Sequence, residues 1–318
     1  GTNNLDKTLN KVTYEPRLFM RYDLTSFWKF STFAGITNSF GSINDVYNGF
    51  ILLSAKNLSA KNTDIQQTKS NFVGSRLEYR NPLNNIFFNV SYNFNDRTSN
   101  ITYLNKLNVD SQQFILEGYN LENNSKTNSA RTELGKYFPK LKTNASVGYN
   151  YSLSNYQQLP ANSTPTESSF IDVEGANQGV SVKFNNNYFS WLSVDYNANW
   201  NFNNTKSPDD ARFNNKTNSF NHALSAYVYP IKNHTLGFTW DELHSSNRER
   251  TAKNAFFDLS YQYSMSEEKI DLELKVLNIT NNNVFENVAF DPTLNQTSYT
   301  TINIRPRQVV LTLKFNFK

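Results

Sequence analysis

The sequence predicts an all-β protein, an antiparallel transmembrane β-barrel, and three observations favour this fold class. Apolar and polar residues alternate with a period of two, the alternating segments are long, and the polar connections between them are alternately short and long. A period of two places successive side chains on opposite faces of a strand, so each segment has one apolar and one polar face.

The alternation is clearest between residues 141 and 153, where Leu141, Val147 and Leu153 share one parity and Lys142 and Asn150 share the other. Two structures carry such a pattern. In a soluble sandwich the apolar face lines a core, whereas in a membrane barrel it meets lipid and the polar face lines the lumen. Periodicity alone leaves both open.

Segment length and connection length favour the barrel. Several segments keep their parity for about eleven to fourteen residues, while strands of globular proteins run about five or six. Short turns are expected near 23–27, 81–85, 138–140, 185–187, 230–233 and 264–269. Long polar loops are expected at 37–48, 54–68, 96–125, 154–174, 203–217, 244–253 and 280–297. Two strands for each short turn, plus the last, give about 13 strands, with long loops on one rim only.

Aromatic residues crowd the strand ends beside the short turns, which is typical of an interfacial girdle. The pairs are Phe27 and Trp28, Phe87 and Phe88, Tyr137 and Phe138, Tyr188 and Phe189, and Tyr227 and Tyr229. Aromatic residues are also ordinary strand formers, which is the alternative interpretation.

Composition excludes several classes of site. The 318 residues contain no cysteine, so disulfides, a Cys-ligated metal and a Cys nucleophile are excluded. The net charge is +4 and no basic tract occurs, which argues against a nucleic-acid partner. No apolar run approaches the roughly 18 residues of a membrane helix, and no signal peptide is recognisable.

The first strand, expected over 11–23, would run downward from the outer side if the short turns face the periplasm. Residues 1–10 would then lie in an extracellular loop. We therefore expect residues 1–318 to form the C-terminal portion of a larger barrel, with further strands encoded ahead of them. The segment 305–318, RPRQVVLTLKFNFK, is expected to be the closing strand of that barrel.

Two segments carry a resemblance to a known family. KIDLELKVLNITNNNVFENVAF, residues 269–290, resembles the penultimate strand of TonB-dependent outer-membrane transporters, with the turn Leu277–Asn281 in place of their NLTN turn. Residues 305–318 resemble their final strand. The segments RLEYRNPLNNIFFNVSYNFN and KYFPKLKTNASVGYNYS are similar to barrel segments of the form common in Bacteroidetes. One departure is that Lys318 follows the aromatic Phe317.

The resemblance covers roughly residues 65–318 and implies a barrel of about 22 strands in a Gram-negative outer membrane. It implies uptake of a bulky nutrient (an oligosaccharide, a peptide or a metal chelate), without enzymatic activity or a cofactor. The partners implied are outer-membrane lipid, the missing N-terminal strands and plug, and a lipoprotein lid or other subunits. Neither a plug domain nor a TonB box is visible in these residues. Alternatives are a scaffolding barrel that transports nothing and a complete porin-like barrel of about fourteen strands.

The predicted face of each strand gives two sets of candidate site residues. An aromatic-ended last strand would carry the signal for barrel assembly, on its lipid-facing residues Val309, Leu311, Leu313, Phe315 and Phe317. The candidate lumen-facing residues are Arg17, Arg21, Arg76, Glu78, Arg80, Lys142, Asp195, Lys275 and Lys314. A charge on the lipid face costs roughly 2–4 kcal/mol at mid-membrane, so these side chains are expected to point inward. They would pair with one another or with a plug, or contact solute.

Other motifs give weaker signals. The three histidines, His222, His234 and His244, are more consistent with isolated wall or loop positions than with a metal site. The acidic pairs Asp209–Asp210 and Glu267–Glu268 lack the regular spacing of a calcium loop. No catalytic serine motif and no phosphate-binding glycine loop is present.

Overall fold

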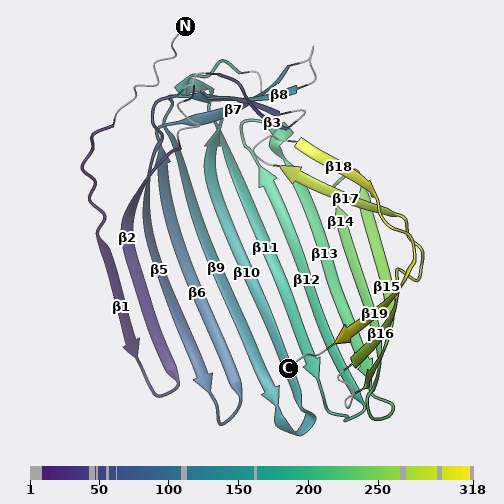
Figure 1. Ribbon diagram of the computed structural model, residues 1–318. Coiled ribbons are helices and arrows are strands. Elements are labelled where there is room, and N and C mark those ends of the chain that lie inside the picture. Colours follow the sequence, from purple (N-terminus) through teal and green to yellow (C-terminus); the bar gives the residue numbers. More distant parts are fainter. Residues whose placement is uncertain are drawn as a thin grey trace.

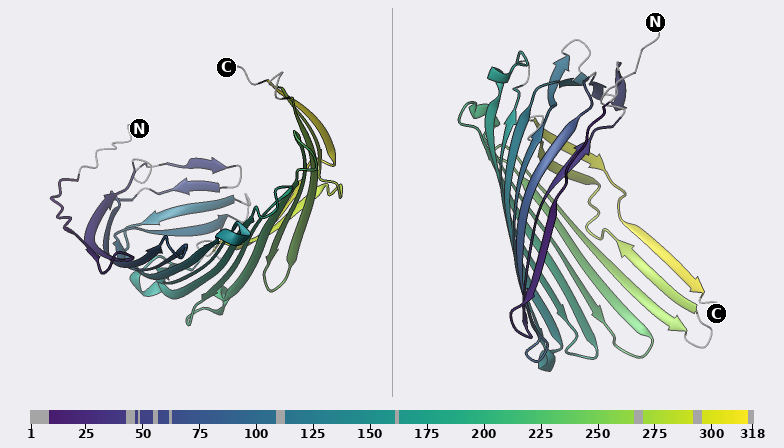
Figure 2. Two further views of the ribbon diagram at one scale, coloured as in Figure 1. Left: turned by 90° about the horizontal axis from the view of Figure 1, so that it is seen from below. Right: turned by 90° about the vertical axis from the view of Figure 1, so that its left-hand side faces the viewer.

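The computed structural model describes residues 9–42, 47, 49–54, 57–61, 63–108, 113–160, 163–265, 270–291 and 296–315. Within them, one antiparallel sheet of 13 strands curves into a trough with a concave and a convex face (Figures 1 and 2). In sheet order the strands are β1 (Arg17–Asp23), β2 (Trp28–Phe40), β5 (Gln67–Asn81), β6 (Ile86–Ser99), β9 (Asn123–Phe138), β10 (Thr143–Gln158), β11 (Ile171–Asn186), β12 (Leu192–Lys206), β13 (Asn215–Val228), β14 (His234–Ser246), β15 (Thr251–Met265), β16 (Ile270–Leu277) and β19 (Gln308–Phe315). The all-β class and the strand number predicted from the sequence are confirmed.

Register carries the face assignment from strand to strand, because directly opposite residues of an antiparallel pair share a face. One continuous row of partners is Val90, Thr132, Tyr149, Val180, Trp200 and Phe220. The adjacent row, on the other face, is Ser91, Arg131, Asn150, Gly179, Asn201 and Ser219. Along these two rows the sheet has one largely apolar and one polar face, although the apolar parity also includes charged residues toward the upper end, such as Lys126 and Glu174.

Tight turns join the strands at the lower end of the sheet, where Figure 1 shows short connections. Three of them contain a left-handed residue, Asn85 (φ 53°), Lys142 (φ 43°) and Asn233 (φ 68°). Asparagine tolerates this conformation better than most residues, which explains two of the three positions. The turn of β9 and β10 also contains the 3-10 helix η1 (Pro139–Leu141). Residues 266–269 of the last expected turn lie outside the described residues.

The connections at the upper end carry further structure that the sequence did not predict. A four-stranded sheet is formed by β3 (Ile51–Ser54), β4 (Asn57–Ala60), β7 (Thr102–Asn108) and β8 (Gln113–Tyr119). A hairpin is formed by β17 (Val284–Asp291) and β18 (Gln296–Asn303). The 3-10 helices η2 (Glu167–Ser169) and η3 (Ala211–Phe213) lie in two other connections. Three of the expected polar loops, 54–68, 96–125 and 280–297, are therefore partly strand.

Two sequence-based boundaries were wrong. The first strand begins at Arg17 and not at residue 11, because Pro16 has no N–H to donate to the ladder, although its carbonyl accepts from Ile36 N (3.0 Å). The long loop expected at 244–253 is a tight turn. Its side-chain acceptor is Asn247 Oδ1, which receives Glu249 N (3.0 Å) and Arg250 N (2.8 Å).

The described strands form an open sheet. β1 pairs with β2 alone and β19 with β16 alone, so each has one edge without a partner strand among the described residues. The same part of the chain contains no helix long and apolar enough to cross a membrane.

The concave wall as candidate binding site

The hairpin β17–β18 identifies the concave face. It crosses in front of β13, β14 and β15 in Figure 1, on the inner side of the trough. Its backbone bonds to polar-face side chains of the wall: Asn254 Nδ2 donates to Glu286 O (2.7 Å), and Val288 N donates to Ser245 Oγ (3.0 Å). The concave face is therefore the polar one, and the apolar parity is convex.

Apart from Arg131 of β9, which lies opposite Asn150, the upper half of the concave wall is uncharged across five strands. From β9 to β13 its side chains are mainly asparagine, serine and threonine, with glycine and a few apolar residues between them. We call this region the amide zone and define it by Thr127, Asn150, Ser152, Ser154, Asn177, Asn199, Asn201, Asn203, Thr217, Ser219 and Asn221. Such a surface offers hydrogen-bond donors and acceptors without a net charge.

A ladder of side-chain amides runs through the amide zone. Asn150 Nδ2 donates to Asn177 Oδ1 (3.3 Å), Asn177 Nδ2 donates to Asn203 Oδ1, and Asn203 Nδ2 donates to Thr217 Oγ1 (3.3 Å). The ladder thus spans β10, β11, β12 and β13. A Cβ at Gly179 would meet the Asn150 amide, so glycine at that position leaves room for the amide where it lies. Each amide still has one N–H and one lone pair for another partner.

The lower half of the concave wall is charged, and the sequence-predicted residues Arg76, Glu78, Arg80 and Asp195 lie there. Arg76 forms an ion pair with Glu78 at 2.6 Å, and Arg80 approaches the same carboxylate at 3.9 Å. Asp195 accepts a hydrogen bond from the Asn185 amide. These residues share one face through the register of β5 and β12 with their neighbours.

The remaining candidate lumen residues lie nearer the edges. Arg17 and Arg21 occupy the concave parity of β1, each near an acid, Glu15 (3.6 Å) and Asp23 (3.9 Å) respectively. Lys142 is the left-handed residue of a lower turn and not part of a strand, so its position follows from the turn and not from strand parity.

At the other edge of the sheet, Lys275 and Lys314 flank Glu273, at 2.9 and 3.7 Å. Glu273 was not among the residues predicted from the sequence, although it forms the ion pairs of both lysines. That the candidate residues face a water-filled lumen stays a prediction.

The last strand places its apolar parity on the convex face. Val309, Leu311, Leu313 and Phe315 pair with Val276, Leu274, Leu272 and Ile270. These four side chains of β19 are all more than half exposed, and the least exposed is Leu313 at 53%. Phe317 lies outside the described residues. The role of these residues in assembly stays a prediction.

Aromatic residues line the lower rim, but in the two predicted pairs that lie wholly within strands only one ring is on the convex face. Consecutive strand residues alternate, so Phe88 and Phe138 are convex whereas Phe87 and Tyr137 are concave. Trp28 packs on Tyr79, with ring centroids 4.7 Å apart. At most one ring of each such pair can therefore belong to a convex girdle, and the girdle itself stays a prediction.

Two hollows lie between the hairpin and the amide zone. One, of about 380 Å³, is lined by Ser154, Tyr156, Asn177, Asn203, Thr217 and Phe290. The other, of about 350 Å³, shares Asn203, Thr217 and Phe290 and adds Asn221, Ser245 and Asn254. Sequence reasoning missed these residues because it selected charged positions. The available signal was the alternating Asn197, Asn199, Asn201 and Asn203 of β12.

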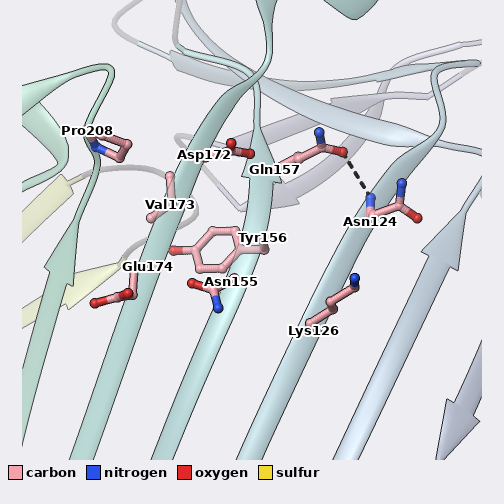
Figure 3. Close-up of a pocket in the computed structure, with 9 residues that line it drawn as sticks. All are labelled: Asn124, Lys126, Asn155, Tyr156, Gln157, Asp172, Val173, Glu174 and Pro208. Atoms are coloured by element: carbon pink, nitrogen blue, oxygen red, sulfur yellow. Dashed lines mark hydrogen bonds between the residues drawn. The ribbon is translucent and has the colours of Figure 1, made fainter.

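A third hollow, of about 390 Å³, opens on the convex side at the upper ends of β9, β10 and β11 (Figure 3). Lys126, Asn155 and Glu174 lie side by side across these strands, and Asn124 N donates to Gln157 Oε1 (3.3 Å). Behind them, Val173 and Tyr156 pack in a small buried cluster with Phe213 of η3. This recess therefore belongs to the outer surface of the wall.

The histidines are separated. His222 is buried on the convex face, 3.7 Å from Glu242 and edge-on to Trp240, with ring centroids 4.5 Å apart. His234 bonds to Tyr261 OH (2.6 Å). His244 lies on β14 and not in a loop, which corrects the sequence-based placement. The described residues contain no group of three His, Asp or Glu side chains that could hold a metal ion.

The acidic pair Asp209–Asp210 has structural partners. Asp210 caps η3 by accepting Arg212 N (3.0 Å), and it holds the Arg212 guanidinium at 2.6 Å. That side-chain hydrogen bond lowers the pKa of the Asp210 carboxyl. Asp209 accepts from Asp172 N (2.9 Å). The other pair, Glu267–Glu268, lies outside the described residues.

No family model and no curated relative matches the chain. Solved structures do. A point-mutant form of the ferric enterobactin receptor of Pseudomonas aeruginosa has a TM-score of 0.52 at 9% identity, over 86% of this chain and 43% of the receptor. A second form of it, in complex with enterobactin, has a TM-score of 0.53 at 8% identity over the same shares. The ferripyoverdine receptor of the outer membrane of Pseudomonas aeruginosa has a TM-score of 0.48 at 12% identity, over 86% and 40%.

The chain thus spans less than half the length of each of these receptors. The likeness to the enterobactin receptor confirms the fold that the sequence resemblance implied. This chain therefore has the fold of a portion of the ferric enterobactin receptor.

Proposed function

We propose that this chain forms part of the barrel wall of a TonB-dependent transporter in the outer membrane of a Gram-negative bacterium. The observation that carries the proposal is the 13-stranded antiparallel sheet with an apolar convex and a polar concave face, folded like part of the enterobactin receptor. An apolar outer face suits lipid, and a polar inner face suits an aqueous passage. The function is solute uptake and not catalysis.

The open edges support a larger barrel. An unpaired strand edge within the hydrocarbon layer costs several kcal/mol for each unsatisfied backbone group, so β1 and β19 require partner strands. We infer that these strands, and a plug that gates passage, come from elsewhere in a longer protein. The lower charged half of the wall, with Arg76 and Glu78, would face that plug.

Cysteine labelling tests the topology, because this chain contains no cysteine of its own. Other cysteines of the intact protein would first be replaced. We expect Thr312→Cys, on the concave parity, to react with a membrane-impermeant maleimide in outer-membrane vesicles. Leu313→Cys, its convex neighbour, should react with an apolar maleimide alone. Equal labelling of both positions by the impermeant reagent would contradict a lipid-facing convex side.

Uptake by whole cells tests transport. A deletion strain and its parent would be supplied with neutral oligosaccharides, peptides or ferric chelates as the limiting nutrient. We expect the deletion to abolish growth on one supply, and a proton uncoupler to abolish uptake of that solute by the parent. A deletion strain that grows like its parent on all three, while a multiprotein complex dissociates, would favour the scaffolding role.

A further inference from the structure

The two hollows beneath the hairpin form one groove. They share Asn203 and Thr217 of the wall, and the side chain of Phe290 on β17 borders both. The wall supplies a polar floor and the hairpin supplies an aromatic side. We infer that this groove, between the amide zone and β17, binds an uncharged, hydroxyl-rich solute, namely an oligosaccharide. This inference rests on the proposed transport function and names its substrate class.

Charge is the first argument. Neither hollow has an Asp, Glu, Lys or Arg among its lining residues, and His244 is the one titratable side chain besides a tyrosine. An anionic chelate or a charged peptide brought into such a groove would lose water without gaining a counter-charge, at a cost of several kcal/mol for each ion. An uncharged solute avoids that cost.

Hydrogen-bond capacity is the second argument. The ladder that joins Asn150, Asn177, Asn203 and Thr217 holds the amides in place and leaves each with unused donor and acceptor positions. Sugar hydroxyls both donate and accept, so they match amides and hydroxyls in either direction. A pre-organised ladder also reduces the entropy lost when a ligand binds.

The aromatic side is the third argument. Phe290 and Tyr156 border the first hollow, and Phe285 joins Phe290 at the second. The ring face presents apolar area next to polar groups, which suits the C–H face of a pyranose. Phe290 is held there because Val288, two residues before it on β17, is buried against the wall (6% exposed).

Surface plasmon resonance on the intact, detergent-purified protein tests the inference. The probes are neutral malto-, manno- and xylo-oligosaccharides, oligogalacturonate as an anionic counterpart, and ferric enterobactin. The variants are Asn203→Leu and Phe290→Ala. The matched control is Asn204→Leu, the next residue of β12, which lies on the convex face opposite Ala176.

We expect at least one neutral oligosaccharide to bind. Its affinity should fall about tenfold or more in Asn203→Leu and in Phe290→Ala, the loss of roughly one good contact. Asn204→Leu should stay within about twofold of the parent. The inference is overturned if no neutral oligosaccharide binds, if only the charged probes bind, or if Asn203→Leu and Asn204→Leu bind alike.

The outcome separates the groove from the transport function. If oligosaccharide binding depends on Asn203 but deletion of the protein leaves growth unchanged, the groove binds oligosaccharide and the transport function is refuted. If the cells take up a ferric chelate in an energy-dependent way that Asn203→Leu does not affect, the transport function stands and oligosaccharide binding in the groove is refuted.

Discussion

Asn254 and Glu286 bond to each other as two strands do. The Asn254 amide donates to Glu286 O (2.7 Å) and accepts from Glu286 N (2.9 Å), so one side chain of β15 satisfies both backbone groups of a residue on β17. Asn254 is 5% exposed. A second contact with Glu286, the 3.0 Å ion pair of Arg250 in the turn before β15, is more exposed. The buried amide is therefore the main polar anchor of the hairpin.

We expect Asn254→Ala to loosen the hairpin without unfolding the sheet. Two hydrogen bonds disappear and Glu286 keeps two unpaired backbone groups, which costs about 1–3 kcal/mol. Hydrogen exchange measured by mass spectrometry should show faster exchange for residues 284–303, with β10 to β12 unchanged. The control is Asn283→Ala, since the Asn283 side chain is exposed. Equal exchange in both variants would refute the anchoring role.

A second prediction concerns Asn278, at the end of β16. Its φ is 53°, and its backbone N–H donates to Asp258 Oδ1 (2.7 Å). Its side-chain Nδ2 donates to Asn282 O (2.6 Å), and its Oδ1 accepts from Asn282 N (3.1 Å). Asn278→Ala loses the side-chain bonds and places a Cβ without compensation in the left-handed region, a cost of roughly 1–2 kcal/mol for the backbone alone.

Asn278→Gly separates the two effects, because glycine accepts the left-handed conformation but forms no side-chain bonds. We expect urea midpoints of the detergent-solubilised protein to fall in the order parent, Asn278→Gly, Asn278→Ala. A glycine variant no more stable than the alanine variant would show that backbone conformation is not limiting at this turn.

The sequence predicted the strands of the wall well, because a strand of about fifteen residues repeats its period-two pattern many times. The convex Tyr149 and Val180 and the concave Asn150 and Ser181 all follow from parity. The sequence did not predict β17, because a short strand in a polar connection forms through tertiary contacts, here those of Val288 and Glu286 with the wall. Local pattern carries no information about such partners.

The binding groove escaped prediction for a similar reason. Phe290 and Asn203 lie far apart in the sequence, and only folding of the hairpin onto the wall brings them to one groove. Charges such as Arg76 stand out in a sequence, whereas a neutral ladder of amides is visible only when register aligns Asn150, Asn177 and Asn203.

A third prediction concerns pH and the small upper sheet. Glu117 of β8 receives Lys106 Nζ (2.6 Å) and the hydroxyl of Tyr119. Burial raises the pKa of the Glu117 carboxyl, but these two hydrogen bonds outweigh burial and hold it below its ordinary value of 4.5. The hydrogen bond to Glu117 raises the pKa of Lys106 above 10.5.

The sign follows from linkage. A lowered carboxyl pKa contributes stability that is complete above pH 4.5 and is lost as pH falls through the folded-state pKa, which lies below 4.5. The raised Lys106 pKa contributes stability up to pH 10.5, which is lost only at still higher pH. We expect exchange protection of β8, corrected for intrinsic rates, to fall in acid. Glu117→Gln should be less protected at neutral pH and lose this acid dependence, and an unchanged acid profile in that variant would refute the assignment.

The last prediction uses neighbouring residues of β19 on opposite faces. Leu313 lies opposite Leu272 on the convex side, and Thr312 lies opposite Glu273 on the concave side. If the convex face meets lipid, Leu313→Arg places a charge in the hydrocarbon layer at roughly 2–4 kcal/mol, whereas Thr312→Arg places one beside a carboxylate. We expect Leu313→Arg to reduce the folded protein in outer-membrane fractions severalfold and Thr312→Arg to leave it nearly unchanged. Equal tolerance of the two substitutions would mean that the convex face is not in contact with lipid, and the membrane assignment would then fail at its physical basis.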